Sequence, residues 1–143
     1  MRNVVVLLAV LALALISAAT AMAGAISVGE PWIREAPPNA KALAAYMTIA
    51  NASAAAVSLE SASSPDFKRV EIHRTDMSHG MAHMMKQPAL PIEAGASVHL
   101  KPGDYHLMLM EPARALRAGD AVSLRLVFDN GEVLEVKAVV KKP

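Results

Sequence analysis

Histidine and methionine side chains gather between residues 73 and 110, and in the densest part, residues 70–87, Val70 and Ile72 are the only large aliphatic residues. Thioether sulfur is a soft, uncharged donor that selects Cu(I), and imidazole binds several transition metals. The chain contains no cysteine and the stretch has no cluster of carboxylates, so this set of donors favours Cu(I) over zinc, iron or calcium. The residues concerned are His73, His79, His83, His99 and His106, with Met77, Met81, Met84, Met85, Met108 and Met110.

The alternative is that these methionines fill a hydrophobic core. Methionine is a flexible core residue, and histidine is common at protein surfaces. Core methionines normally have aliphatic neighbours, whereas in MSHGMAHMM (residues 77–85) the sulfurs adjoin serine, glycine and histidine. Metal binding is therefore the preferred interpretation of the cluster. The sequence leaves three roles open for Met77, Met81 and Met85 in this cluster. They could surround the ligands, serve as spare ligands, or form an apolar rim. The roles of Met110, His79 and His83 are equally open.

A strand over YHLMLM (residues 105–110) would bring two of the donors together. Successive side chains of a strand point to opposite faces, so His106 and Met108 share one face while Leu107 and Leu109 share the other. We expect the leucines to enter the core. The backbones of His106 and Met108 would then stand roughly 7 Å apart, a gap that an imidazole and a thioether can close around one ion.

Upstream, FKRVEIHR and AHMMKQ are typical of two strands joined by a tight connection. A turn centred between Ser78 and His79 would place His73 directly opposite Met84, with Cβ atoms roughly 5 Å apart. The segment is therefore predicted to be a hairpin that presents one imidazole and one thioether.

These four residues fit a known signature. The chain resembles the periplasmic copper chaperones of the PCu(A)C type. The signature of that family is a histidine and a methionine separated by ten residues, then, after twenty-one residues, a histidine and a methionine separated by one residue. His73, Met84, His106 and Met108 have this spacing. PWIREAPP, AAYMTIAN, LKPG and YHLMLM are also similar to family sequence. The resemblance implies a cupredoxin-like β-sandwich that holds Cu(I) near its surface and delivers it for assembly of the CuA centre of cytochrome c oxidase.

Two departures from the family limit what is carried over. Thr75 stands where many members have a methionine two residues after the first histidine, so a fifth sulfur ligand is not implied. The sequence ends Lys141-Lys142-Pro143, without the His- and Met-rich tail that some members use for Cu(II). A second copper bound through such a tail is therefore not expected.

The elements that must position these residues are short strands separated by turns. No apolar period of 3.6 residues persists for three turns, and alternating runs dominate, which predicts an all-β, single-domain antiparallel β-sandwich of the Greek-key type. Asn130-Gly131 tolerates the positive φ of a type I′ turn, so the last two strands should form a hairpin. The other strand candidates are residues 25–28, 31–35, 42–51 and 55–62.

The first residues predict an exported protein. Arg2, the apolar run 4–16 and the small residues 21–23 have the layout of a secretory signal peptide. We expect residues 1–23 to be removed, leaving a copper-binding domain at 24–143 in the periplasm. A retained N-terminal anchor is the alternative, because a spanning helix needs roughly twenty apolar residues.

Composition excludes several classes of function. Of 14 basic residues only Arg2 lies in the leader, which leaves 13 against 13 acidic residues and no basic face for nucleic acid. The absence of cysteine excludes thiol redox catalysis, thiolate zinc sites and blue-copper electron transfer. Neither a Gly-x-Ser-x-Gly elbow nor a His-Glu-x-x-His motif occurs, so no enzyme activity and no catalytic residue is predicted.

The preferred function is therefore a copper carrier. Its expected partners are the copper ion and a thiol-containing acceptor, namely the CuA domain of cytochrome c oxidase or its assembly factors, and it should act as a monomer without a membrane partner once the leader is cleaved. Copper sequestration for resistance and a purely structural adhesion-type sandwich are the alternatives. Stoichiometry separates them, because a chaperone should bind one transferable ion, a store several and a structural module none.

Overall fold

A computed structural model describes residues 24–143 as ten β-strands. They are β1 (Ile26–Arg34), β2 (Ala42–Asn51), β3 (Val57–Ser63), β4 (Phe67–Asp76), β5 (His83–Lys86), β6 (Leu90–Ile92), β7 (Ser97–Leu100), β8 (Tyr105–Pro112), β9 (Ala121–Phe128) and β10 (Val133–Lys141). This part of the chain offers no helix long and apolar enough to cross a membrane. The predicted signal peptide, residues 1–23, lies outside the described residues.

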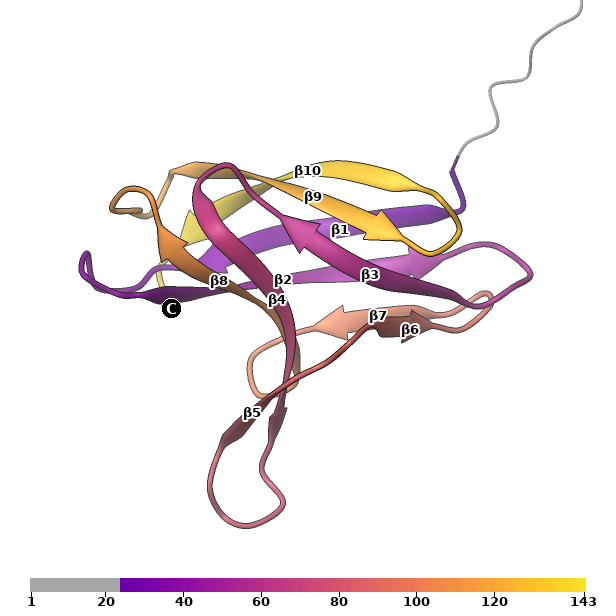
Figure 1. Ribbon diagram of the computed structural model, residues 1–143, viewed down its shortest axis with the longest axis horizontal. Helices are drawn as coiled ribbons and strands as arrows, with labels where there is room; N and C mark the ends of the chain where they lie inside the picture. Colours follow the sequence, from indigo (N-terminus) through magenta and orange to yellow (C-terminus); the bar gives the residue numbers. More distant parts are fainter. Residues whose placement is uncertain (1–23) are drawn as a thin grey trace, which may run out of the picture.

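The predicted all-β class is confirmed, but the strands form one closed, barrel-like sheet where a sandwich of two sheets was expected (Figure 1). The pairing runs β5-β4-β8-β2-β1-β10-β9-β3-β6, and β3 also pairs with β4 through Ala62 and Val70. That contact closes a ring of the seven strands from β4 round to β3.

The expectation of a wholly antiparallel sheet was wrong for one pair. β1 and β10 run parallel, with Trp32 opposite Val139 and Ile33 opposite Val140. A closed ring with an odd number of strands cannot alternate direction throughout, so at least one neighbouring pair must be parallel. Since the ring contains seven strands, closure itself requires this exception.

The core lies inside the barrel and is built from alternating residues. On β8, Leu107 and Leu109 are fully buried, as predicted, and Met47 on β2 is only 3% exposed. On β9, Val122 and Leu124 take the same inward positions. Each such aliphatic side chain contributes roughly 1.5–3 kcal/mol on burial, and β8 is thereby fixed against the core on the face away from Met108.

The predicted C-terminal hairpin is confirmed, although its turn type differs. β9 and β10 pair antiparallel through residues such as Val127 and Val133. Gly131 has φ 87°, whereas Asn130 is not among the described residues with positive φ, so the turn is not type I′. The N–H of Gly131 donates to the carbonyl of Phe128 (3.1 Å), which fits a type I turn followed by a left-handed glycine.

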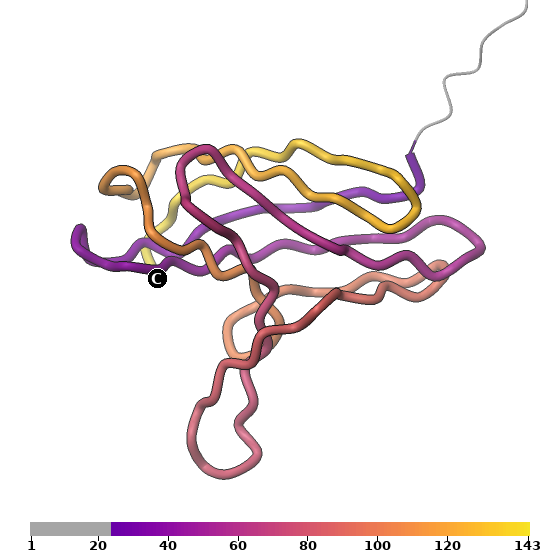
Figure 2. The backbone as a smooth tube through the Cα atoms, viewed as in Figure 1, coloured from indigo at the N-terminus to yellow at the C-terminus, as the bar shows by residue number. Residues whose placement is uncertain are grey.

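The β4–β5 hairpin extends away from the rest of the barrel (Figure 2). One edge of β4 pairs with β8 as far as Arg74, and the other edge pairs with β5 from His73 to Asp76. All four residues of β5 are exposed, and β5 has β4 as its only strand partner in residues 24–143. The predicted pair of strands is thus confirmed as a projecting hairpin whose outer strand has little packing of its own.

Candidate metal centre

Two histidines lie side by side where β4 and β8 pair. His73 and His106 are partners in the register, and their ring centroids are 5.9 Å apart. His106 is 2% exposed, and the side chain of His73 is 12% exposed. Sequence spacing alone placed these imidazoles on different strands, and the strand pairing now brings them together below the protein surface.

Each imidazole has one nitrogen bonded and one free. In His106, Nδ1–H donates to the carbonyl oxygen of Asp104 (3.0 Å), and in His73, Nε2–H donates to Oε2 of Glu71 (2.8 Å). A carbonyl and an ionised carboxylate only accept, so these contacts fix the proton of each neutral ring. The remaining atoms, Nδ1 of His73 and Nε2 of His106, are buried without a hydrogen-bond partner.

Two buried nitrogens without a partner are unfavourable unless a ligand or ion satisfies them. A buried polar atom without a partner costs about 1–3 kcal/mol, and both atoms here carry lone pairs. Metal-binding histidines normally donate their other N–H to a carboxylate or a backbone carbonyl. Glu71 and Asp104 supply those two kinds of acceptor, so the imidazoles fit a metal ion.

Glu71 is held ionised by its surroundings. Its hydrogen bond with His73, followed by the positive charges of Lys86 and Arg69, holds the pKa of this carboxyl below its usual value, against the opposing effect of desolvation. Lys86 Nζ lies 3.5 Å and Arg69 Nε 3.3 Å from Oε1. The carboxylate therefore accepts from His73 at neutral pH and orients its ring.

Two thioethers lie beside the imidazoles. Met108 follows His106 by two residues on the same face of β8, and Met84 on β5 is 57% exposed. Both line an open cavity of about 370 Å³, and Tyr46 lines it too, with its ring centroid 6.4 Å from that of His106. Met84 and Met108 thus share a cavity that Tyr46 links to His106, while neither histidine is part of its lining.

The predicted pairing of His73 with Met84 was wrong by two residues. His73 lies opposite Lys86, and Thr75 lies opposite Met84. The loop of residues 77–82 is centred between His79 and Gly80, one residue later than predicted, and Gly80 there takes φ 73°. A shift of two residues keeps side chains on the same face, so Met84 still faces the side of the sheet that carries His73.

Sequence reasoning missed how Glu71 and Asp104 support the imidazoles, although it noted Asp104 near His106 as weak evidence of a catalytic dyad. Glu71 precedes His73 by two positions on β4, a spacing that puts both side chains on the same strand face. Asp104 contributes its backbone carbonyl, while its carboxylate accepts the N–H of Tyr105 (2.9 Å), so it forms no carboxylate–histidine dyad. Tyr46 was also missed, and burial raises its pKa while Arg34 opposes that effect.

The remaining histidines and methionines lie elsewhere. His99 Nδ1 contacts Thr48 Oγ1 (3.0 Å) between β7 and β2, and Met110 Sδ contacts Arg69 Nε (3.2 Å). Within residues 24–143 no group of three or more His, Cys, Asp or Glu side chains is arranged to hold a metal ion. An ion at the His73–His106 pair would therefore depend on the sulfurs to complete its ligands.

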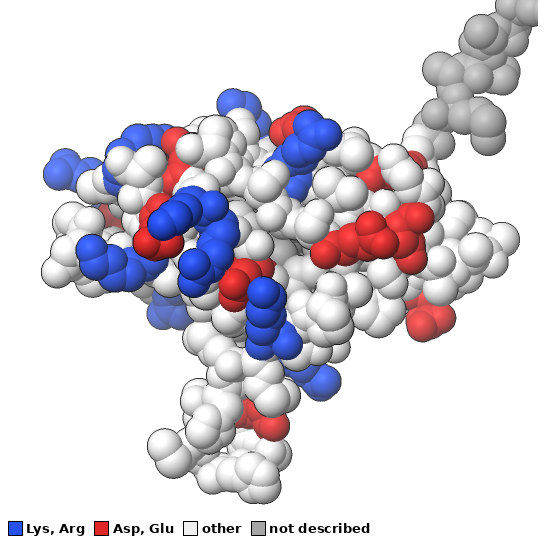
Figure 3. Space-filling model, viewed as in Figure 1, with Lys and Arg blue, Asp and Glu red and all other residues white. Residues whose placement is uncertain are grey.

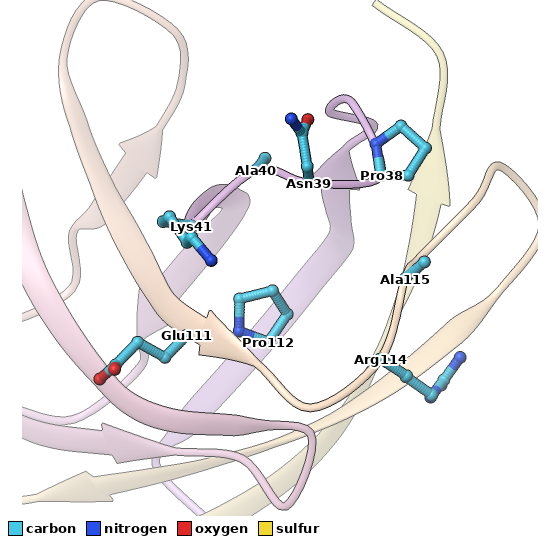
Figure 4. Close-up of a pocket in the computed structure, with 8 residues that line it drawn as sticks. All are labelled: Pro38, Asn39, Ala40, Lys41, Glu111, Pro112, Arg114 and Ala115. Carbon is cyan, nitrogen blue, oxygen red and sulfur yellow. The ribbon is translucent and has the colours of Figure 1, made fainter.

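A second cavity, larger than the one that the thioethers line, is unrelated to these donors. It has a volume of about 410 Å³ and lies at the opposite end of β8, between the loop after β1 and the segment after β8 (Figure 4). Its lining holds no imidazole and no thioether; it consists of Pro38, Asn39, Ala40, Lys41, Glu111, Pro112, Arg114 and Ala115. Size therefore does not identify the metal centre, whereas the unpartnered nitrogens do.

The chain belongs to the LpqE-like family, whose model, "Putative lipoprotein LpqE-like", matches residues 26–140. A putative lipoprotein of Leifsonia xyli is 28% identical over 120 residues, covering 83% of this chain and 71% of the relative.

Solved structures confirm the resemblance to the PCu(A)C family. The solution structure of CuI-DR1885 from Deinococcus radiodurans is 32% identical with a TM-score of 0.68, covering 86% of this chain and 83% of that one. The copper-bound PCuAC domain from PmoF2 is 23% identical with a TM-score of 0.72, covering 84% of this chain and 95% of that one. This structure shows that the two chains share a fold.

Proposed function

We propose that this protein binds one Cu(I) ion tightly and carries it to an acceptor. The ligands would be Nδ1 of His73, Nε2 of His106 and the sulfurs of Met84 and Met108. The observation that carries the proposal is the pair of buried, unpartnered imidazole nitrogens beside a cavity that both thioethers line. CuI-DR1885, whose name states its metal, supports the choice of Cu(I).

The donor chemistry explains both retention and release. Four neutral, mostly soft donors stabilise Cu(I) more than Cu(II), so the bound ion should stay reduced. Since the ligand set contains no thiolate, a cysteine-bearing acceptor can replace these ligands one at a time. The exposed Met84 is the natural first ligand to leave, because an incoming thiolate reaches it without displacing the core.

The destination follows from the family. We propose delivery for assembly of the CuA centre of cytochrome c oxidase, in the periplasm, by a monomeric, cupredoxin-like domain of residues 24–143 released from the signal peptide 1–23. The lipoprotein name of the Leifsonia relative supports a location in the cell envelope. No catalytic role is assigned, and the Asp104 carboxylate has its own backbone partner.

Transfer distinguishes a carrier from a store. The mature protein, loaded with one equivalent of Cu(I) without oxygen, is mixed with a reduced dicysteine CuA domain, and the copper content of both is measured after separation. We expect the copper on the CuA domain, and His106→Ala should reduce the loading available for transfer. Copper that stays wholly on this protein, with several thiol acceptors in excess, would instead support sequestration for resistance.

A further inference from the structure

The β4–β5 hairpin has a second face that the proposed site does not use. His73, Thr75 and Met84 share the face that looks toward His106. Side chains of the alternate residues must point the other way. We call this second face, which carries Arg74, Asp76, His83 and Met85, the outer face of the hairpin. On it the register places Asp76 opposite His83 and Arg74 opposite Met85.

Two exposed methionines line one cavity on this outer face. Met77, directly after β4, and Met85 on β5 both line an open cavity of about 350 Å³. They are 59% and 47% exposed, so they are not packed in the core. Asp76 and Asp104 line the same cavity, and so does Arg74, whose guanidinium lies over the ring of Tyr105 (5.1 Å to the centroid). Toward its tip, on the side seen in Figure 3, the hairpin shows few charged side chains.

An imidazole lies on the same face of β5 as Met85, although it is not part of the cavity lining. His83 is two residues from Met85 on the same strand face, the spacing that His106 and Met108 have on β8. Directly opposite residues have Cβ atoms about 4.5–5.5 Å apart, which brings His83 close to Asp76. Asp76 Oδ1 accepts the N–H of Ser78 (2.8 Å), and this contact fixes the carboxylate at the mouth of the turn. Within residues 24–143, the ring of His83 makes no hydrogen bond.

We propose that the outer face of the hairpin is a second, weaker Cu(I) site, formed by the sulfurs of Met77 and Met85 and the imidazole of His83, with Asp76 supplying a nearby negative charge. Two thioethers and an imidazole again select Cu(I) among biological metals. The site is weaker than the first because its donors are exposed and one lies in a loop, so binding must order them. It faces away from His73 and fills independently of it.

Methionine methyl NMR tests the assignment residue by residue. The anaerobic protein, carrying ¹³C-methyl methionine, is titrated with Cu(I), which is diamagnetic. The first equivalent should move the Met84 and Met108 signals, and further Cu(I) should move those of Met77 and Met85. Met77 and Met85 signals that stay in place under excess Cu(I) would overturn the second site and leave the first intact.

Matched leucine variants assign the ligands. Met77→Leu with Met85→Leu keeps the apolar bulk but removes both sulfurs. Loss of an outer-shell partner lowers metal affinity by about 10- to 100-fold, so loss of both sulfur ligands should lower the affinity for the second equivalent of Cu(I) by at least as much. Met81→Leu, at the same hairpin tip but outside the cavity lining, is the control and should change neither equivalent. An equal loss in the Met81 variant would overturn the assigned ligand set.

A third variant separates this proposal from the first site. His106→Ala with Met108→Ala should abolish the early response of Met84 while the Met77 and Met85 signals still move with Cu(I). If those signals also stop moving, the outer sulfurs are an extension of the first site, and the independent second site is refuted.

Discussion

The two halves of the proposed copper site differ in how firmly the fold holds them. His106 and Met108 lie on β8, which pairs on both edges and rests on a buried core face. Met84 lies on β5, which pairs with β4 alone and whose residues are all exposed. Segments with few buried contacts open at lower free-energy cost than core strands.

This difference suggests a division of labour within the site. The barrel half keeps the imidazoles oriented whether or not metal is present, because Asp104 and Glu71 hold them by hydrogen bonds. The hairpin half can move away with one sulfur and expose the ion to an acceptor. A carrier needs both properties, since a wholly buried site would release slowly and a wholly exposed one would bind weakly.

The largest effect should come from the barrel half. His106→Ala removes a buried nitrogen donor. Removing a residue that only supports a ligand lowers metal affinity by up to about 100-fold, so losing the ligand itself should lower Cu(I) affinity by more. Competition with a chromogenic Cu(I) chelator measures this. His99→Ala, which removes an exposed ring bonded to Thr48, is the matched control and should bind as the wild type does.

Removing the sulfurs one at a time sharpens the comparison. Met84→Ala and Met108→Ala should each weaken Cu(I) binding strongly while the fold remains intact, because both side chains retain solvent contact. Met84→Ala should leave the thermal unfolding temperature almost unchanged, since surface changes are usually within about 0.5 kcal/mol. Unchanged Cu(I) affinity in the double variant would remove both methionines from the ligand set.

A substitution in the core should change stability without changing Cu(I) affinity. Met47→Ala creates a cavity in the barrel and should lower the free energy of unfolding by about 2–5 kcal/mol, with Cu(I) affinity retained in the folded fraction. Urea unfolding followed by circular dichroism measures the loss. Met81→Ala, on the exposed loop, is the control and should lower stability very little.

The smallest effect concerns the residue that orients His73. Glu71→Gln keeps the shape but loses the charge, and Cu(I) affinity should fall by about tenfold, toward the low end for outer-shell partners. The folded pKa of Glu71 is lowered, so its contribution to stability is present above the unfolded carboxyl pKa and disappears as pH falls through the folded value. The variant should lack this part of the acid dependence in unfolding experiments; an identical pH profile would contradict the role assigned to Glu71.

Much of this architecture was predictable because it depends on local rules. The alternation in residues 105–110 sent Leu107 and Leu109 inward, and Asn130-Gly131 marked the final hairpin. Strand parity put His106 and Met108 on one face, but Met110 shares that face, so the PCu(A)C signature was needed to select the four proposed ligands. Parity also explains why the error in hairpin register left Met84 on the predicted face.

Only the tertiary structure decided the rest. Closure of a seven-stranded ring requires a parallel pair, and no single strand carries that information. The contact between His73 and His106 depends on the pairing of β4 with β8 across more than thirty residues of sequence, and Tyr46 joins them from β2. The free nitrogens exist because Glu71 and Asp104 occupy the others. Periodicity determines the direction of a side chain within its strand, whereas long-range pairing determines which side chains it meets.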